Sequence, residues 1–270
     1  MLTFFRQFLE VQAVISERKD GSMKVFSERP EDNRENRKRF FEEQGILSDR
    51  VVNAGLVHGT NVEIITPHNV TDYRRSYFIG NNKKSGVNKM KGGVVLDTDG
   101  LVTREKNIFL SVTAADCLPV FFSDPIAGVV GIAHAGWRGI VSGVIGKTLK
   151  KMSECGAAKE NVSVAIGPHI GVCHFEIQTD ILPRFAQYEK YVIKKEGKSQ
   201  SIANDVTRLF VDLEGIVKEQ LRAAGIAKTH IETSPLCTFC ESQTFFSYRR
   251  ERSKEPQVMV ATIGMQEKAP

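Results

Sequence analysis

Cys117 and His134 stand at the ends of two apolar, strand-like runs within "TAADCLPVFFSDPIAGVVGIAHAGWRG", residues 113–139. A thiol and an imidazole brought together make either a nucleophile with its general base or two ligands of a transition metal. Both can also be core groups, because cysteine is among the most buried residue types. The pair alone therefore leaves three roles open.

The residues around this pair favour a functional role. Asp116 precedes the cysteine, and Gly136 and Arg138 follow His134 where a core strand would place Val or Ile. In "GLVHGTNV", His58 ends another strand-like run. Two histidines and a cysteine from three strand ends make a zinc site with an open fourth position. Zinc held in this way activates water or polarises a substrate oxygen.

A second group of candidate ligands lies in "HIETSPLCTFC", residues 230–240. His230, Cys237 and Cys240 are residue types found in zinc nucleobase deaminases, whose signature combines H-x-E with P-C-x-x-C. Here Leu236 separates the proline from the first cysteine, and the histidine is only seven residues upstream of that cysteine. We therefore interpret Cys237 and Cys240 as structural thiols, with a zinc site that includes His230 as the alternative.

Composition indicates a soluble globular protein. With 270 residues, of which 41% are hydrophobic, the chain can bury a substantial core, and we expect a single domain over residues 1–270. The net charge of +5 is spread along the chain, which is consistent with a small anionic substrate and does not indicate nucleic-acid binding. We expect a monomer or a weak homo-oligomer.

The same features predict a cytoplasmic protein. No run of about 18 apolar residues exists, so no membrane span is predicted. The apolar N-terminus is interrupted by Arg6 and Glu10 and lacks a cleavage site, unlike a signal peptide. Five cysteines, an odd number, do not indicate a disulfide framework.

Apolar periodicity predicts an α+β layered fold, because strands and helices mix without strict βαβ alternation. The expected strands lie in residues 11–26 (two strands), 108–122, 128–134, "NVSVAIG", "FFSYRR" and "VMVATIG". The expected helices are residues 31–44, closed by Gly45, residues 137–154, and a segment that ends near Gly225. Residues 73–100 are expected to form a surface loop.

Several motifs together resemble one known family. "VHG", "TAADCLPV", "HAGWRG", "AIGPHIGVCHFEI" and "CTFCESQTFFSYRR" occur in the order typical of laccase-domain proteins, also described as multicopper polyphenol oxidoreductase-like proteins or peptidoglycan editing factors. The resemblance covers nearly the whole chain. Leu56 stands where the family usually has glutamine, and "SKEPQ" follows Arg250 where a Gly-Arg pair is usual.

The resemblance implies a fold, a metal and an activity. The implied fold is a three-layer α/β/β arrangement of mixed sheets, similar to that of cysteine hydrolases. The implied zinc ligands are His58, Cys117 and His134. The implied activity is phosphorolysis of adenosine, inosine and methylthioadenosine, with additional deamination of adenosine.

We assign roles to the remaining candidates on this basis. Asp116 is expected to transfer protons, and Arg138 to bind phosphate with help from the helix that begins beside it. Arg18 and Arg249, together with Arg250, are further candidates for substrate binding. Two alternatives stay open: a cysteine hydrolase that edits peptidoglycan precursors, and a copper-dependent polyphenol oxidase (laccase), since two His and one Cys also bind copper.

Overall fold

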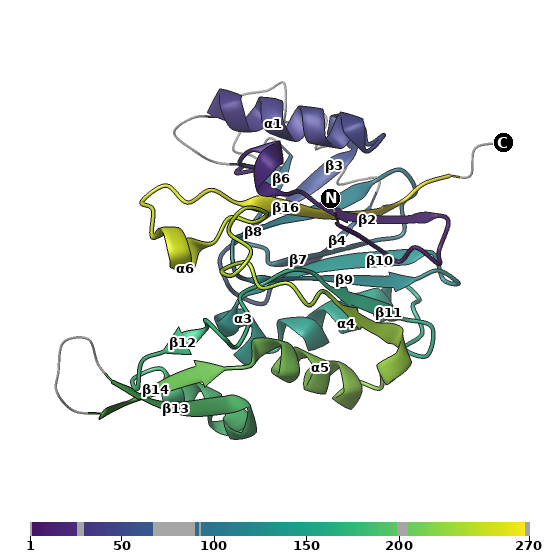
Figure 1. Cartoon of the computed structure of the whole chain (residues 1–270). Coiled ribbons are helices and arrows are strands. Elements are labelled where there is room, and N and C mark those ends of the chain that lie inside the picture. Colours follow the sequence, from purple (N-terminus) through teal and green to yellow (C-terminus); the bar gives the residue numbers. More distant parts are fainter. Residues whose placement is uncertain (1, 26–29, 67–89, 92, 199–204, 268–270) are drawn as a thin grey trace, which may run out of the picture.

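The computed structural model describes residues 2–25, 30–66, 90–91, 93–198 and 205–267. Over these residues, two mixed β-sheets lie face to face, with helices on their outer faces (Figure 1). This confirms the predicted α+β fold of layered mixed sheets. No helix within these residues is long and apolar enough to cross a membrane.

The first sheet contains strands from both the N-terminal and the C-terminal parts of the chain. In spatial order its strands are β1 (Leu2–Phe4), β2 (Val11–Ile15), β16 (Met259–Met265), β8 (Phe109–Ala114), β3 (Val51–Gly55), β6 (Val94–Leu96) and β5 (Met90–Lys91). Strand β3 runs parallel to both β8 and β6, and the other pairs are antiparallel.

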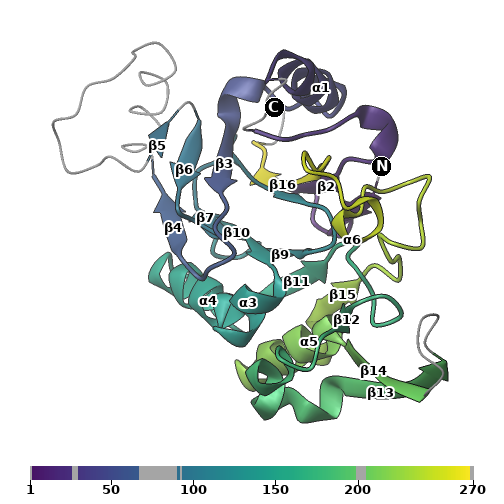
Figure 2. The same cartoon turned by 90° about the vertical axis from the view of Figure 1, so that its left-hand side faces the viewer.

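The second sheet supports the candidate site. In spatial order its strands are β15 (Ile231–Thr233), β11 (Ser163–Ile166), β9 (Leu118–Asp124), β10 (Val129–Ala135), β7 (Gly100–Thr103) and β4 (Val62–Ile65). Its centre is the antiparallel hairpin of β9 and β10, in which His134 is paired with Pro119. A separate sheet of β12 (Glu176–Ile177), β14 (Asp205–Val211) and β13 (Val192–Lys198) lies beside the layered body (Figure 2).

The helices cover the sheets from outside. Their bounds are α1 (Pro30–Glu43), α3 (Trp137–Val141), α4 (Val144–Glu154), α5 (Leu213–Ala223) and α6 (Tyr248–Glu251), with 3₁₀ segments η1 (Arg18–Asp20), η2 (Ser48–Arg50), η3 (Leu182–Tyr191) and η4 (Lys228–His230). Helices α4 and α5 pack on the second sheet and α1 on the first. Phe122 faces α4 and α5, and its neighbour Phe121 faces the first sheet. Burial on both faces explains why these strands are apolar throughout.

The helix expected over residues 137–154 is in fact two helices. Helix α3 ends at Val141, and α4 begins at Val144. Gly143 between them has φ 87°, a left-handed conformation that glycine adopts at little cost. The segment after His134 is therefore only a short helix, so the dipole of a long helix does not assist Arg138.

Other expected elements also differ from the structure. Residues 108–122 divide into β8 and β9 because residues 115–117 form a bend between the two sheets. The second strand expected in residues 11–26 is replaced by η1 and irregular backbone up to Val25. The strand expected at "FFSYRR" is also replaced, by three residues of irregular backbone and the first three residues of α6. Residues 73–89 lie outside the described residues, and the rest of that expected loop contains β5 and β6. By contrast, α1, with Gly45 at φ 68° behind it, and α5 are confirmed.

Candidate metal centre

Three predicted ligands converge at one end of the β9–β10 hairpin. Cys117 lies directly before β9, His134 is the penultimate residue of β10, and His58 follows β3. Their ligand atoms lie within 4.8 Å of one another. The two imidazole rings are nearly perpendicular, with centroids 4.8 Å apart. A pair of nitrogens and one sulfur at such distances suit a tetrahedral zinc ion with a free fourth position.

Asp99 accepts hydrogen bonds from two of these ligand residues, His58 and His134. It is fully buried at the start of β7, and its carboxylate oxygen Oδ1 lies 3.1 Å from His134 Nδ1. The backbone N–H groups of His58 and Gly59 donate to Oδ1 and Oδ2 at 2.9 and 2.7 Å. A carboxylate that accepts the Nδ1 proton leaves Nε2 free to bind metal. The sequence reasoning missed Asp99, because "DTDG" resembles an ordinary turn before a strand.

The charges of these groups are strongly coupled. Burial raises the pKa of the Cys117 thiol, but the charge and hydrogen bonds of His134 and His58 outweigh it and lower this pKa to about 6. Burial lowers the pKa of His134, but Cys117 and Asp99 outweigh it and raise this pKa to about 9. Hydrogen bonds from His134 and Gly59 likewise outweigh the effect of burial and lower the pKa of Asp99. Without metal, the site therefore holds a thiolate and an imidazolium at neutral pH.

Zinc binding is expected to release about one proton per chain at pH 7.5, because metal ligands must be deprotonated. Cys117, with a pKa of about 6, is already ionised at this pH, whereas His134, with a pKa of about 9, still carries its Nε2 proton. Below pH 6 Cys117 is protonated as well, so zinc binding should release a second proton. The affinity for zinc should therefore fall more steeply with decreasing pH in that range. Calorimetry in buffers of different ionisation enthalpy measures the number. Release of no proton at pH 7.5 would contradict the coupled pair.

Gly136 leaves room for the ligands. A Cβ at this position would lie 3.1 Å from Cys117 Sγ and 3.2 Å from His58 Cδ2. Its φ of −72° is open to any residue, so the constraint is space and not backbone conformation. This explains the glycine of the "HAGW" motif.

We expect Gly136→Ala to weaken metal binding by about tenfold, because the added methyl displaces a ligand side chain. Gly146→Ala is the matched control, since a Cβ there meets nothing within 4 Å and its place inside α4 favours alanine. Competition with a chromophoric chelator measures both affinities. Equal affinities in the two variants would show that Gly136 does not shape the centre.

Asp116 is turned toward the C-terminal part of the chain. Its carboxylate accepts hydrogen bonds from Thr238 Oγ1 and from the backbone N–H of Arg249, both at 2.7 Å. Its backbone φ of 101° is unusual for a residue with a side chain. Such strain is concentrated at functional sites. The structure thus gives Asp116 a positioning role beside Cys117, and its expected role in proton transfer stays a prediction.

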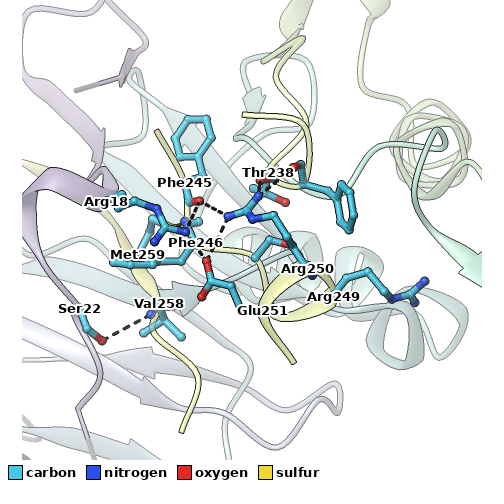
Figure 3. A network of polar contacts seen from close by, with 12 residues as sticks. Arg18, Ser22, Thr238, Phe245, Phe246, Arg249, Arg250, Glu251, Val258 and Met259 are labelled. Carbon is cyan, nitrogen blue, oxygen red and sulfur yellow. Dashed lines mark hydrogen bonds and ion pairs between the residues drawn. The ribbon is translucent and has the colours of Figure 1, made fainter. Parts of the chain in front are cut away.

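Arg250 and Arg18 both donate hydrogen bonds to backbone carbonyl groups between Thr238 and Phe245. Arg250 donates to the carbonyl oxygens of Thr238 and Phe239 at 2.7 and 2.8 Å (Figure 3). Arg18 pairs with Glu251 and also donates to the carbonyl oxygen of Phe245. Arg250 also donates to the carbonyl oxygen of Phe245, so both of its Nη groups are engaged, whereas Arg18 makes both of its contacts through Nη2 and its buried Nε has no hydrogen-bond partner among the described residues.

Arg249 and Arg138 differ in how far their guanidinium groups are engaged. The side chain of Arg249 points away from the Arg18–Glu251 network (Figure 3) and donates to the carbonyl oxygens of His174 and Glu176. Arg138 is exposed, stacks on Trp137 at 4.4 Å, and forms no ion pair with the described residues. Among the predicted substrate contacts, Arg138 therefore has the most available charge. The roles of Arg18 and Arg249 in substrate binding stay predictions.

The alternative zinc ligands do not form the group expected from the sequence. Among the described residues, the other group of possible ligands contains Cys173, His174, Cys237 and Cys240, and His230 is not part of it. His230 lies in η4, where its buried Nδ1 has no hydrogen-bond partner. The alternative site with His230 therefore does not form, because nearness along the chain does not bring this histidine to the two cysteines.

Comparison with known proteins establishes the family. A family model described as multi-copper polyphenol oxidoreductase laccase matches residues 16–266. The chain belongs to this family. The resemblance seen in the sequence motifs is therefore confirmed.

Relatives of this laccase-family chain carry enzyme names. "Purine nucleoside phosphorylase YlmD" of Geobacillus stearothermophilus is 31% identical over 233 residues, which cover 86% of this chain and 78% of that protein. "Adenosine deaminase RL5", from an unknown prokaryotic organism, is 32% identical over 56% of this chain and 56% of its own length. The crystal structure of Bacillus licheniformis hypothetical protein YfiH has a TM-score of 0.78 and 25% identity, covering 95% of this chain and 93% of that one. These names support an enzymatic role in purine nucleoside phosphorolysis or deamination at the level of the family.

Proposed function

We propose that this laccase-family chain is a zinc-dependent purine nucleoside phosphorylase that also deaminates adenosine. Adenosine, inosine and methylthioadenosine are the proposed substrates of phosphorolysis. The observation that carries the proposal is the convergence of His58, Cys117 and His134 above the buried Asp99, with the exposed Arg138 four residues after His134. The relatives' names support the reaction class.

The donor set fits zinc. One thiolate and two imidazoles match the mixed sulfur and nitrogen ligands of catalytic zinc sites, and Asp99 supplies the usual carboxylate behind a ligand histidine. When bound there, zinc would supply Lewis-acid polarisation of water or of a substrate oxygen. His58, Cys117 and His134 would hold this group, and Asp99 would keep the Nδ1 proton of His134 in place.

In phosphorolysis, a phosphate oxygen forms a bond to C1′ of the ribose while the bond from C1′ to the purine nitrogen breaks. The ribose becomes cation-like and negative charge develops on the purine, so catalysis depends on positioned donors and charges. Arg138 is proposed to bind the phosphate, with Arg18 and Arg249 as further substrate contacts. In deamination, water adds to C6 of adenine and ammonia leaves, with Asp116 proposed to transfer the proton.

A turnover assay with inosine, adenosine and phosphate tests this function. Inosine should be consumed only with inorganic phosphate, releasing hypoxanthine and ribose 1-phosphate. Adenosine should also release ammonia without phosphate, because water is then the only second reactant. Turnover of a peptide substrate without phosphate, with both nucleosides left intact, would overturn the proposal.

Arg138→Ala should reduce phosphorolysis by about ten- to a hundredfold, because one charge-assisted anion contact contributes about 1.5–3 kcal/mol. Deamination should change less, since it binds no phosphate. The ratio of the two rates, measured in one preparation, cancels errors in active concentration. Arg184→Ala is a matched control, because Arg184 is an exposed arginine of η3, an element that carries none of the ligands or the proposed substrate contacts. An equal loss of both activities in Arg138→Ala would remove Arg138 from phosphate binding.

A cysteine hydrolase is the second candidate, and a specific observation favours it. The coupled Cys117 and His134, with Asp99 behind the imidazole, match the nucleophile, base and orienting group of a thiol enzyme. In that scheme His58 would only help to stabilise the Cys117 thiolate, whereas a metal centre uses it as the third ligand. Chelation distinguishes the two candidates. A chelator should abolish the activity of a zinc enzyme, but it should leave intact the activity of a thiol nucleophile that cleaves amide bonds of cell-wall precursors.

A copper oxidase receives less support from the described residues. A multicopper oxidase requires a trinuclear cluster in addition to a single-copper site. In the described part of the chain, the grouped ligands form two sets, one with three members and one with four. Each set suits a single ion, and neither supplies the ligands of a trinuclear copper cluster.

A further inference from the structure

A second set of metal-binding side chains lies outside the centre described above. Cys173, His174, Cys237 and Cys240 each present a ligand atom, and these four atoms lie within 4.8 Å of one another. The first two residues lie between β11 and β12, and the other two follow β15. The cluster therefore joins two segments that are more than sixty residues apart.

The distances within this cluster match a tetrahedral zinc ion. The Sγ atoms of Cys173 and Cys240 are 3.8 Å apart, and His174 Nδ1 lies 3.2 and 3.4 Å from these two sulfurs. Around zinc, Zn–S bonds of about 2.3 Å and Zn–N bonds of about 2.05 Å separate two sulfurs by about 3.8 Å and a sulfur from a nitrogen by about 3.5 Å. The ligand atoms of Cys173, His174 and Cys240 are already placed at nearly these separations, and Cys237 Sγ lies within 4.8 Å of each of them.

Neighbouring groups hold these ligands in place. The backbone N–H of Gly171 donates to Cys237 Sγ at 3.2 Å, which is the kind of contact that stabilises a thiolate ligand. A Cβ on Gly171 would lie 3.2 Å from Cys173 Sγ, so glycine allows this approach. The His174 ring stacks on Phe239 with centroids 4.0 Å apart and an angle of 16° between the planes. The stacking fixes the ring with Nδ1 toward the sulfurs.

We propose that Cys173, His174, Cys237 and Cys240 bind a structural zinc ion, separate from the centre at Cys117. Four protein ligands fill the tetrahedral shell, which leaves no position for substrate and is typical of structural sites. This proposal replaces the interpretation of Cys237 and Cys240 as metal-free thiols.

The ion would fasten the segment that positions Asp116. Thr238, within the C-x-x-C turn, donates to Asp116 Oδ1, and Arg249 donates to Oδ2 through its backbone N–H. Arg250 binds the carbonyl oxygens of Thr238 and Phe239 in the same turn. Loss of the ion should therefore loosen the support beneath Cys117 without removing any ligand of the Cys117 centre.

Metal analysis of the purified, zinc-loaded full chain tests the proposal. The wild type should hold about two zinc ions per chain, and Cys173→Ser/Cys240→Ser and Cys117→Ala should each hold about one. Cys155→Ser is the matched control with two ions, because this buried cysteine belongs to neither group. A wild type with one ion, lost entirely on Cys117→Ala, would overturn the proposal. If the Cys117 centre of the proposed function held no zinc, the wild type and Cys117→Ala should each hold one ion and Cys173→Ser/Cys240→Ser none, so the two failures are distinguishable.

A measurement on the wild type covers the case in which the double variant does not fold. Cys173 and Cys240 are exposed, but burial and the neighbouring thiols raise the pKa of both, so prolonged treatment with iodoacetamide at alkaline pH should modify them unless metal occupies them. Zinc-loaded protein should resist modification at both, and chelator should remove the protection, as read by peptide mass spectrometry. Equal modification with and without chelator would reject the site. A Cys173–Cys240 disulfide in the unreduced protein, seen as a loss of two hydrogens, would also reject it.

Discussion

Cys117→Ala should lose the metal ion held with His58 and His134 and reduce phosphorolysis and deamination together by at least about a thousandfold. The thiol is the one sulfur ligand of this centre, and its charge is also the main favourable partner of the His134 imidazolium. Removal of this ligand leaves two histidines, which are too few for a stable zinc site. Metal analysis and both assays on one preparation provide the measurement.

Cys155→Ala is the control for this variant, because Cys155 is a buried cysteine at the end of α4, away from both groups of ligands. It should keep the metal and both activities. The double variant Cys117→Ala/His134→Ala removes two ligands at once. Retention of the wild-type metal content in that double variant would reject the ligand assignment.

Asp99→Ala should weaken metal binding by about 10–100-fold and lower the free energy of unfolding of the metal-free protein by about 3–5 kcal/mol. The carboxylate is fully buried and is contacted by two backbone N–H groups and by His134 Nδ1. Its loss leaves those donors without a partner and removes one of the two negative charges beside the imidazolium, the other being the Cys117 thiolate. Chelator competition and denaturant titration measure the two effects separately.

Asp124→Ala separates the metal effect from general destabilisation. Asp124 is also fully buried, at the opposite end of β9, and accepts hydrogen bonds from three backbone N–H groups. Its loss should lower stability as well, but metal affinity should stay at the wild-type value because Asp124 touches no ligand. If both variants lost metal affinity equally, Asp99 would have no specific role at the centre.

The sequence by itself was sufficient for the family, the layered fold and the choice of three candidate ligands. Residue type carries this information, because Cys117, His134 and His58 interrupt apolar strand ends where core residues are otherwise expected. Periodicity likewise predicted α5, whose buried Leu213, Ile216, Val217 and Leu221 repeat at the spacing of a helix, while α1 was predicted from its charged composition and the glycine that closes it. In both cases the pattern lies within a short stretch of sequence, so it can be read without knowing which distant residues that stretch contacts.

Tertiary structure alone decided which residues support those ligands. Asp99 reaches His134 because β7 pairs with β10, a register that the "DTDG" stretch does not specify. Cys237 and Cys240 meet Cys173 and His174, and not the nearby His230, because the segments after β11 and β15 lie side by side. Gly143 divides a helix that the apolar spacing predicts as continuous. The physical reason is the same for all three: strand pairing and backbone turns set distances between residues remote in the chain, and local composition contains no measure of such distances.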